Sequence, residues 1–160
     1  MVALSVLGRF AFSVLPHFKP VTAIVVIAGM YLGAESGFLC GALSAVLSNI
    51  MFGQGPWTPF QMFSWGLIGL LAAFFSVSLK KSKLALAVFG VFSGIIFSLL
   101  MDGWTVLWAE GTFSASRYLA FVVSALPVTA IYAVSNVLFL LVLAVPIGGK
   151  LDRVIKKYGI

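Results

Sequence analysis

The residues with the most chemical character in this chain recur at regular spacing on one expected helix. Trp57, Gln61 and Trp65 occupy every fourth position, and side chains at this spacing lie on one face of an α-helix. Two indole rings and an amide on such a face can stack on a flat organic molecule and hydrogen-bond to its edge. The alternative interpretation is an interfacial belt of tryptophans, which suits Trp57 but not Trp65, two turns deeper.

A polar segment with the sequence FGQGPWTPFQ, residues 52–61, leads into this face. Backbone without helical hydrogen bonds is tolerated at membrane depth only where it lies beside protein or water. We therefore interpret the segment as a shaped, polar loop next to a bilayer. Its glutamine, Gln54, is a further candidate for contact with a ligand.

A second aromatic pair lies near the end of a later apolar segment. Trp104 and Trp108 repeat the spacing of four, Asp102 precedes them, and Arg117 follows in the next connection. Aromatic faces with a few polar groups suit a planar small molecule with polar edges. A tryptophan belt beside a solvated loop is again the alternative, and it is the interpretation that we favour for Glu110.

Few other polar side chains interrupt the apolar runs. Asn49 and Tyr132 are expected in the outer half of their helices, so we predict that they contact a ligand, whereas Asn136 is expected to pack against another helix. Arg9 lies inside an apolar run, where its insertion costs about 2.5–3.5 kcal/mol. It should therefore face the bundle, with Glu35, Asp102 or a ligand carboxylate as the alternatives for its partner.

The composition is that of an integral membrane protein. Of 160 residues, 62% are hydrophobic and 9% are charged, and the mean hydropathy is +1.16, far from the values of soluble domains. Neither a paired carboxylate within a span, a histidine cluster, a P-loop nor a nucleophile motif is present, and Cys40 is the single cysteine. We therefore expect no enzyme activity, no metal site and no cofactor.

The fold expected is all-α, a compact bundle of six transmembrane helices in a single domain, residues 1–160. The apolar runs predict helices over 2–15, 21–32, 37–52, 59–79, 84–108 and 118–147, followed by a basic tail over 150–160. The run at 2–15 is short for a span, which suggests a trimmed or misassigned N-terminus, with a short tilted helix as the alternative. Lysines at 80, 81 and 83 and the basic tail place both termini in the cytoplasm. The net charge of +6 thus reflects topology and the lipid bilayer, and we expect no nucleic-acid partner.

Small residues are also regularly spaced. They lie at Gly29, Gly33, Gly37, Gly41 and Ala45, and again at Gly90, Gly94 and Ser98. Small residues at every fourth position let helices approach closely in a membrane. Internal packing is the interpretation that we favour, with a docking surface for a partner as the alternative.

Four segments resemble a known family: residues 7–10 (LGRF), 19–23 (KPVTA), 37–45 (GFLCGALSA) and 52–62 (FGQGPWTPFQM). They are similar to a subgroup of S components, the substrate-binding membrane subunits of bacterial energy-coupling factor (ECF) vitamin transporters. The resemblance implies a multi-pass protein of the bacterial plasma membrane that captures a vitamin outside the cell. It also implies docking on a transmembrane coupling subunit that carries two ATPase subunits.

In the family, outer loops and the outer parts of helices four to six hold the ligand. Carried onto this chain, the resemblance implies as binding residues Lys19, Gln54, Trp57, Gln61, Trp65, Asp102, Trp104, Trp108 and Arg117. The family's Ala-xxx-Ala docking motif of the first helix is absent, because Ala3 is followed by Leu7.

The subgroup looks most like S components associated with corrinoids, so we rank cobalamin first and riboflavin-like ligands next. The alternative function is a structural or assembly membrane protein that packs against partner subunits and binds no ligand.

Overall fold

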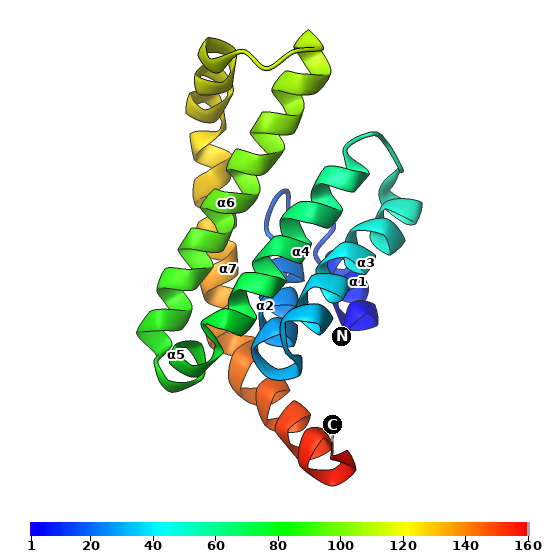
Figure 1. Cartoon of the computed structure of the whole chain (residues 1–160), viewed down its shortest axis with the longest axis vertical. Coiled ribbons are helices and arrows are strands. Elements are labelled where there is room, and N and C mark those ends of the chain that lie inside the picture. The colour runs from blue at the N-terminus through cyan, green and yellow to red at the C-terminus, as the bar shows by residue number, and fades with distance from the viewer. Residues whose placement is uncertain (160) are drawn as a thin grey trace.

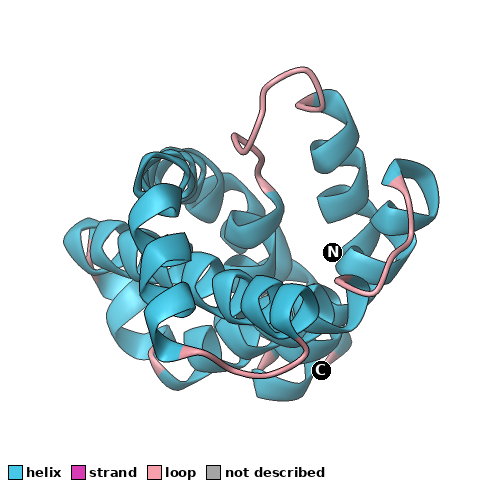
Figure 2. Ribbon diagram, turned by 90° about the horizontal axis from the view of Figure 1, so that it is seen from above, coloured by secondary structure: helices cyan, strands magenta, loops and turns pink. Residues whose placement is uncertain are grey.

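The computed structural model describes residues 1–159, and the described chain is helical throughout apart from short connections (Figure 2). The helices are α1 (Val2–Ala11), α2 (Val21–Leu32), α3 (Ala34–Phe52), α4 (Thr58–Phe74), α5 (Ser76–Lys81), α6 (Lys83–Glu110) and α7 (Ala115–Tyr158). The expected all-α fold is confirmed.

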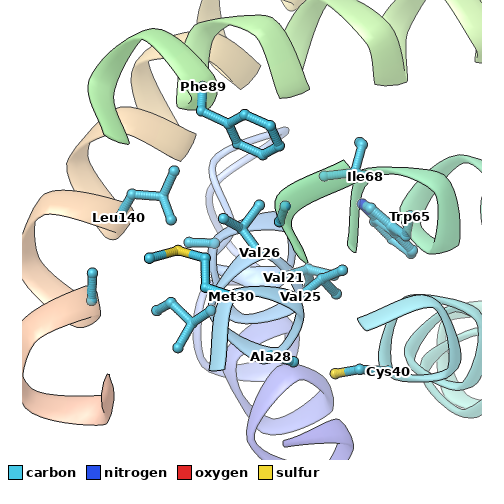
Figure 3. Packing of buried hydrophobic residues seen from close by; sticks show 14 of the residues in the cluster. Val21, Val25, Val26, Ala28, Met30, Cys40, Trp65, Ile68, Phe89 and Leu140 are labelled. Atoms are coloured by element: carbon cyan, nitrogen blue, oxygen red, sulfur yellow. The ribbon is translucent and has the colours of Figure 1, made fainter. Parts of the chain in front are cut away.

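Helix α2 forms the centre of the bundle. Every residue from Val21 to Met30 is buried, as expected of a helix that is apolar on all sides. Figure 3 shows its side chains surrounded by residues of the other helices, among them Ile68 of α4, Phe89 of α6 and Leu140 of α7. The remaining helices therefore share one core that is organised around α2.

Glycines bring the helices around this centre into close contact. A Cβ atom on Gly37 of α3 would lie 2.5 Å from the carbonyl oxygen of Gly69 of α4, and one on Gly29 of α2 would collide with the same oxygen. In the other half of the bundle, a Cβ atom on Gly94 of α6 would lie 2.7 Å from the backbone nitrogen of Ala133 of α7. The prediction that small residues serve internal packing is confirmed at these glycines.

The ends of the first and the last helix lie well away from those expected. The first helix ends at Ala11 instead of residue 15, because the chain tightens into turns in which Ser13 N–H donates to the Phe10 carbonyl at 3.0 Å. The last helix continues past residue 147 to Tyr158, because a proline inside a helix bends it without ending it where the freed backbone groups find other partners. The basic tail is thus mostly helical.

The expected helix 59–79 is interrupted at Phe75. The N–H of this residue points at the carbonyls of both Leu71 and Ala73, and the short helix α5 then begins at Ser76. Helix α5 and the α2–α3 turn lie at one end of the molecule, whereas the α3–α4 and α6–α7 connections lie toward the other (Figure 1).

Within residues 1–159, three helices are long and apolar enough to cross a membrane, namely α3, α6 and α7. The other apolar helices are shorter, α1, α2 and α4 among them. The apolar character of the bundle therefore agrees with an integral membrane protein, and the count of six spans stays a prediction.

The close contact between α6 and α7 leads to a prediction with a matched control. Gly94→Ala should lower the free energy of unfolding by about 1–3 kcal/mol, because its methyl group meets the backbone of α7. Gly149→Ala in α7 should have no destabilising effect, since a Cβ atom there meets nothing within 4 Å. Thermal unfolding of the purified protein, followed by tryptophan fluorescence, checks this. Equal shifts in Tm for both variants would contradict the packing.

Candidate functional site

A cavity of about 380 Å³ lies under the connection between α1 and α2. Pockets for small molecules usually have volumes of roughly 300–1,000 Å³. The lining combines aromatic, polar and cationic side chains and comes from five helices and the α1–α2 connection. Its members are Arg9, Pro16, His17, Lys19, Val21, Thr22, Gln61, Trp65, Phe97, Tyr132 and Asn136.

One wall of the cavity is aromatic and fixed in orientation. The rings of Trp65 and Phe97 are stacked, with centroids 5.1 Å apart and an interplanar angle of 19°, and Tyr132 meets Phe97 edge to face at 5.3 Å. The indole N–H of Trp65 donates to the hydroxyl of Thr22 at 3.3 Å. Packing and a hydrogen bond therefore hold these rings in fixed orientations.

Arg9 reaches from α1 toward the end of α3. Its guanidinium donates hydrogen bonds to the hydroxyl of Ser48 and, at 2.8 Å, to the side-chain oxygen of Asn49. Its Cζ atom lies 4.9 Å from the ring centroid of Phe52 and 5.4 Å from that of Trp65. Neutral acceptors and aromatic faces thus surround this charge, which faces the bundle as expected.

Asn49 connects Arg9 to the cavity wall. Its side-chain nitrogen donates to the hydroxyl of Thr58 at 2.9 Å and to the side-chain oxygen of Gln61 at 2.8 Å. Thr58 in turn donates to the side-chain oxygen of Gln54 at 2.9 Å. One polar network therefore links α1, α3 and the start of α4, and it fixes which end of the Gln61 amide is free for other partners.

The connection between α1 and α2 is attached to α7. The Nδ1 atom of His17 lies 2.9 Å from the hydroxyl of Tyr132, and the backbone N–H of Lys19 donates to the hydroxyl of Ser135 at 3.0 Å. His17 has a φ of 60°, which is uncommon for a residue other than glycine and costs energy that these contacts must offset. The connection thus covers the cavity in a defined conformation.

The side chain of Lys19 points into the same region. Its ammonium group lies 5.2 Å from the ring centroid of Phe52. Burial, and then the nearby charge of Arg9, lower the pKa of the Lys19 ammonium below its ordinary value. Lys19 and Arg9 thus lie against the same aromatic ring.

The structure brings five of the residues predicted to bind a ligand together. Lys19, Gln61, Trp65 and Tyr132 line the cavity, and Asn49 lies directly behind Gln61. Asn136 lines it as well and donates to the Gly90 carbonyl at 3.4 Å, so its predicted packing role is confirmed. Sequence reasoning did not select the other lining residues, Pro16, His17, Val21, Thr22 and Phe97.

The other predicted contacts lie outside this cavity. Gln54 donates to the Val46 carbonyl at 2.9 Å, and Trp57 covers Gly55 with 39% of its surface exposed. Of the three residues expected to share one face, Gln61 and Trp65 therefore line the cavity, and Trp57, which precedes α4, does not.

The second aromatic pair forms a separate group. Trp104 packs against Trp108 and Phe60, with centroids 5.2 and 4.7 Å apart. Arg117 forms an exposed ion pair with Glu110 at 3.4 Å. Asp102 has a buried carboxylate oxygen with no hydrogen-bond partner within residues 1–159. Apart from Phe60 of α4, these residues belong to the C-terminal part of α6 and the start of α7.

An aromatic-walled cavity inside a bundle of apolar helices defines a membrane protein that binds a small molecule. The chain matches the family described as "ECF-type riboflavin transporter, S component" over residues 1–153, and it belongs to this family. It is thus a multi-pass membrane subunit for vitamin uptake with an ECF transporter and not an enzyme. Neither a curated protein nor a solved structure matches the chain.

The family assignment changes the order of the expected ligands. Its name points to riboflavin, whereas cobalamin was ranked first on the resemblance of short segments. Cobalamin specificity is not supported, because those segments identify the S component and carry little information about its ligand.

Asn49 and Asn136 offer a matched test of the network. Asn49→Ala removes an acceptor of Arg9 and two further hydrogen bonds, so it should lower the free energy of unfolding by about 1.5–3 kcal/mol. Asn136→Ala removes one long hydrogen bond and should cost about 0.5–1.5 kcal/mol. Thermal unfolding without ligand checks the order, and a larger effect at Asn136 would contradict the role of the network.

Proposed function

We propose that this chain binds riboflavin, or a closely related flavin, outside a bacterial plasma membrane and delivers it to a coupling subunit with two ATPases. The observation that carries the proposal is the aromatic wall formed by Trp65 and Phe97 inside the cavity. A flavin has a flat ring system with hydrogen-bonding groups along one edge. Stacking supplies contact area for such a ring, and polar side chains fix its orientation.

The polar side chains around the wall have suitable free groups. The side-chain oxygen of Gln61 accepts from Asn49, so its amide nitrogen is left to donate to a carbonyl of the flavin ring. Thr22, Tyr132 and Asn136 also face the cavity and can bind ring edges or the hydroxyl groups of the ribityl chain. Of the binding residues predicted from the sequence, we retain the four that line the cavity: Lys19, Gln61, Trp65 and Tyr132.

The volume of the cavity also supports a flavin. About 380 Å³ lies toward the lower end of the range for small-molecule sites, roughly 300–1,000 Å³. A corrinoid is several times larger than riboflavin and would require a much larger opening. The ligand contacts predicted at Gln54, Trp57, Asp102, Trp104, Trp108 and Arg117 stay predictions.

We propose that α1, α2, α3, α4, α6 and α7 are the six spans and that both termini are cytoplasmic. In this topology α4 and α7 run in the same direction and α6 runs in the opposite one. The lysines of the α5–α6 corner, after α4, and those at the end of α7 therefore lie on the same side of the membrane. Cytoplasmic segments are enriched in such residues. The α1–α2 connection over the cavity then faces outside. This orientation supports capture from the exterior.

The alternative of a structural or assembly protein without a ligand is disfavoured by the family assignment. It differs from the transport hypothesis in one simple property, because it predicts no vitamin binding by the isolated chain.

Titration of the purified protein with riboflavin tests the proposal. Riboflavin fluorescence should be quenched on binding, with one site per chain. Trp65→Ala should weaken binding by roughly 5- to 150-fold, the equivalent of about 1–3 kcal/mol for one stacked ring. Excess cobalamin should not compete.

Phe74→Ala is the matched control, because this aromatic residue lies on the same helix with 70% of its surface exposed. It should bind riboflavin as the parent protein does. The proposal fails if neither riboflavin nor a closely related flavin is bound at micromolar concentration, or if both variants lose affinity equally.

A further inference from the structure

Two cationic side chains share one region of the cavity. Arg9 and Lys19 both line it, and both lie over the ring of Phe52, at 4.9 and 5.2 Å from its centroid. The hydrogen-bond partners of the guanidinium, Ser48 and Asn49, are neutral. The contacts of both cations are therefore aromatic or uncharged.

No carboxylate within the described residues neutralises this pair. The chain has four acidic residues, and the ion pair between Arg117 and Glu110 is the one formed within residues 1–159. Glu35 lies in the first turn of α3 and Asp152 near the end of α7, away from the cavity. Asp102 is not part of the cavity lining and forms no ion pair.

Unpaired charges of the same sign are costly in a partly dehydrated site. Each loses hydration on burial, and each raises the energy of the other. The lowered pKa of Lys19 reflects both effects. Cation–π contacts with Phe52 and Trp65 offset part of the cost, by about 0.5–2 kcal/mol each. A bound anion would offset more, since guanidinium and ammonium groups are strong partners of phosphate and carboxylate oxygens.

We propose that the physiological ligand carries an anionic group that binds between Arg9 and Lys19. This inference rests on the proposed function and narrows its substrate class. Arg9, Lys19 and Trp65 line the same cavity, and Arg9 lies 5.4 Å from the ring centroid of Trp65. A flavin that fills the cavity beside this ring therefore has its side chain close to both cations. The flavin that fits is the one with a phosphate ester on the ribityl chain, flavin mononucleotide, in preference to neutral riboflavin.

A matched pair of ligands tests the inference, because the two flavins differ only in the phosphate ester. The full chain, purified in uncharged detergent, is titrated with each flavin at low and at high ionic strength. Flavin mononucleotide should bind at least tenfold more tightly at low salt, and this preference should shrink in 1 M NaCl, where charges are screened within about 3 Å.

Variants connect the preference to the two cations. Lys19→Gln should reduce the preference severalfold, and Arg9→Gln should abolish it. Lys81→Gln, which removes a lysine of the α5–α6 corner, should leave it unchanged. If Arg9→Gln does not fold, the result for Lys19→Gln decides, because this residue lies in a connection. An unchanged preference in Lys19→Gln would overturn the inference.

The same titrations distinguish the other outcomes. Equal or weaker binding of flavin mononucleotide, with riboflavin still bound, overturns the anionic ligand and leaves the proposed function intact. If neither flavin binds, both the anionic ligand and the proposed function are contradicted. Repetition in nanodiscs of phosphatidylcholine with and without phosphatidylglycerol tests lipid headgroups as the anion. Loss of the preference only with phosphatidylglycerol would assign the cations to lipid and overturn the inference.

Discussion

The guanidinium of Arg9 has to be accommodated between apolar helices, and the architecture of the site depends on this constraint. A charge between apolar helices is costly unless it faces protein groups that replace water. Ser48 and Asn49 supply acceptors, and the rings of Phe52 and Trp65 supply aromatic faces. The groups that stabilise the charge are thus the same groups that form and orient one side of the cavity.

This arrangement requires a rigid support, which the packing around α2 provides. Helix α2 is buried along most of its length, and glycines let α3 and α4 approach it closely. Thr22 of α2 holds the indole of Trp65, and Asn49 holds the amide of Gln61. Helix α4 therefore presents its ring and its amide to the cavity from fixed positions, and residues of the α1–α2 connection line the same cavity.

The sequence predicted the parts of the fold that depend on local pattern. Helix α2 has the expected bounds because its apolar run is limited by Pro20 and Gly33. The break at Phe75 has no comparable signal, since an apolar run continues through it. The passage of α7 beyond Pro146 was missed because a single proline does not say whether a helix bends or ends.

The candidate site was also predicted only in part, because local spacing identifies residues on one helix and not those that packing brings to it. Helical spacing identified Gln61 and Trp65, but it also included Trp57, whose ring folds onto Gly55 at the start of α4. Phe97 and His17 come from a different helix and from a connection, so their place in the cavity depends on tertiary packing that no spacing reveals.

The most direct measurement of the central claim is an experimental structure of the chain with riboflavin bound. The account predicts the flavin ring against Trp65, beneath the α1–α2 connection, with Gln61 hydrogen-bonded to the ring edge. A flavin bound instead beside Trp104 and Trp108, with the cavity under the connection unfilled, would contradict it.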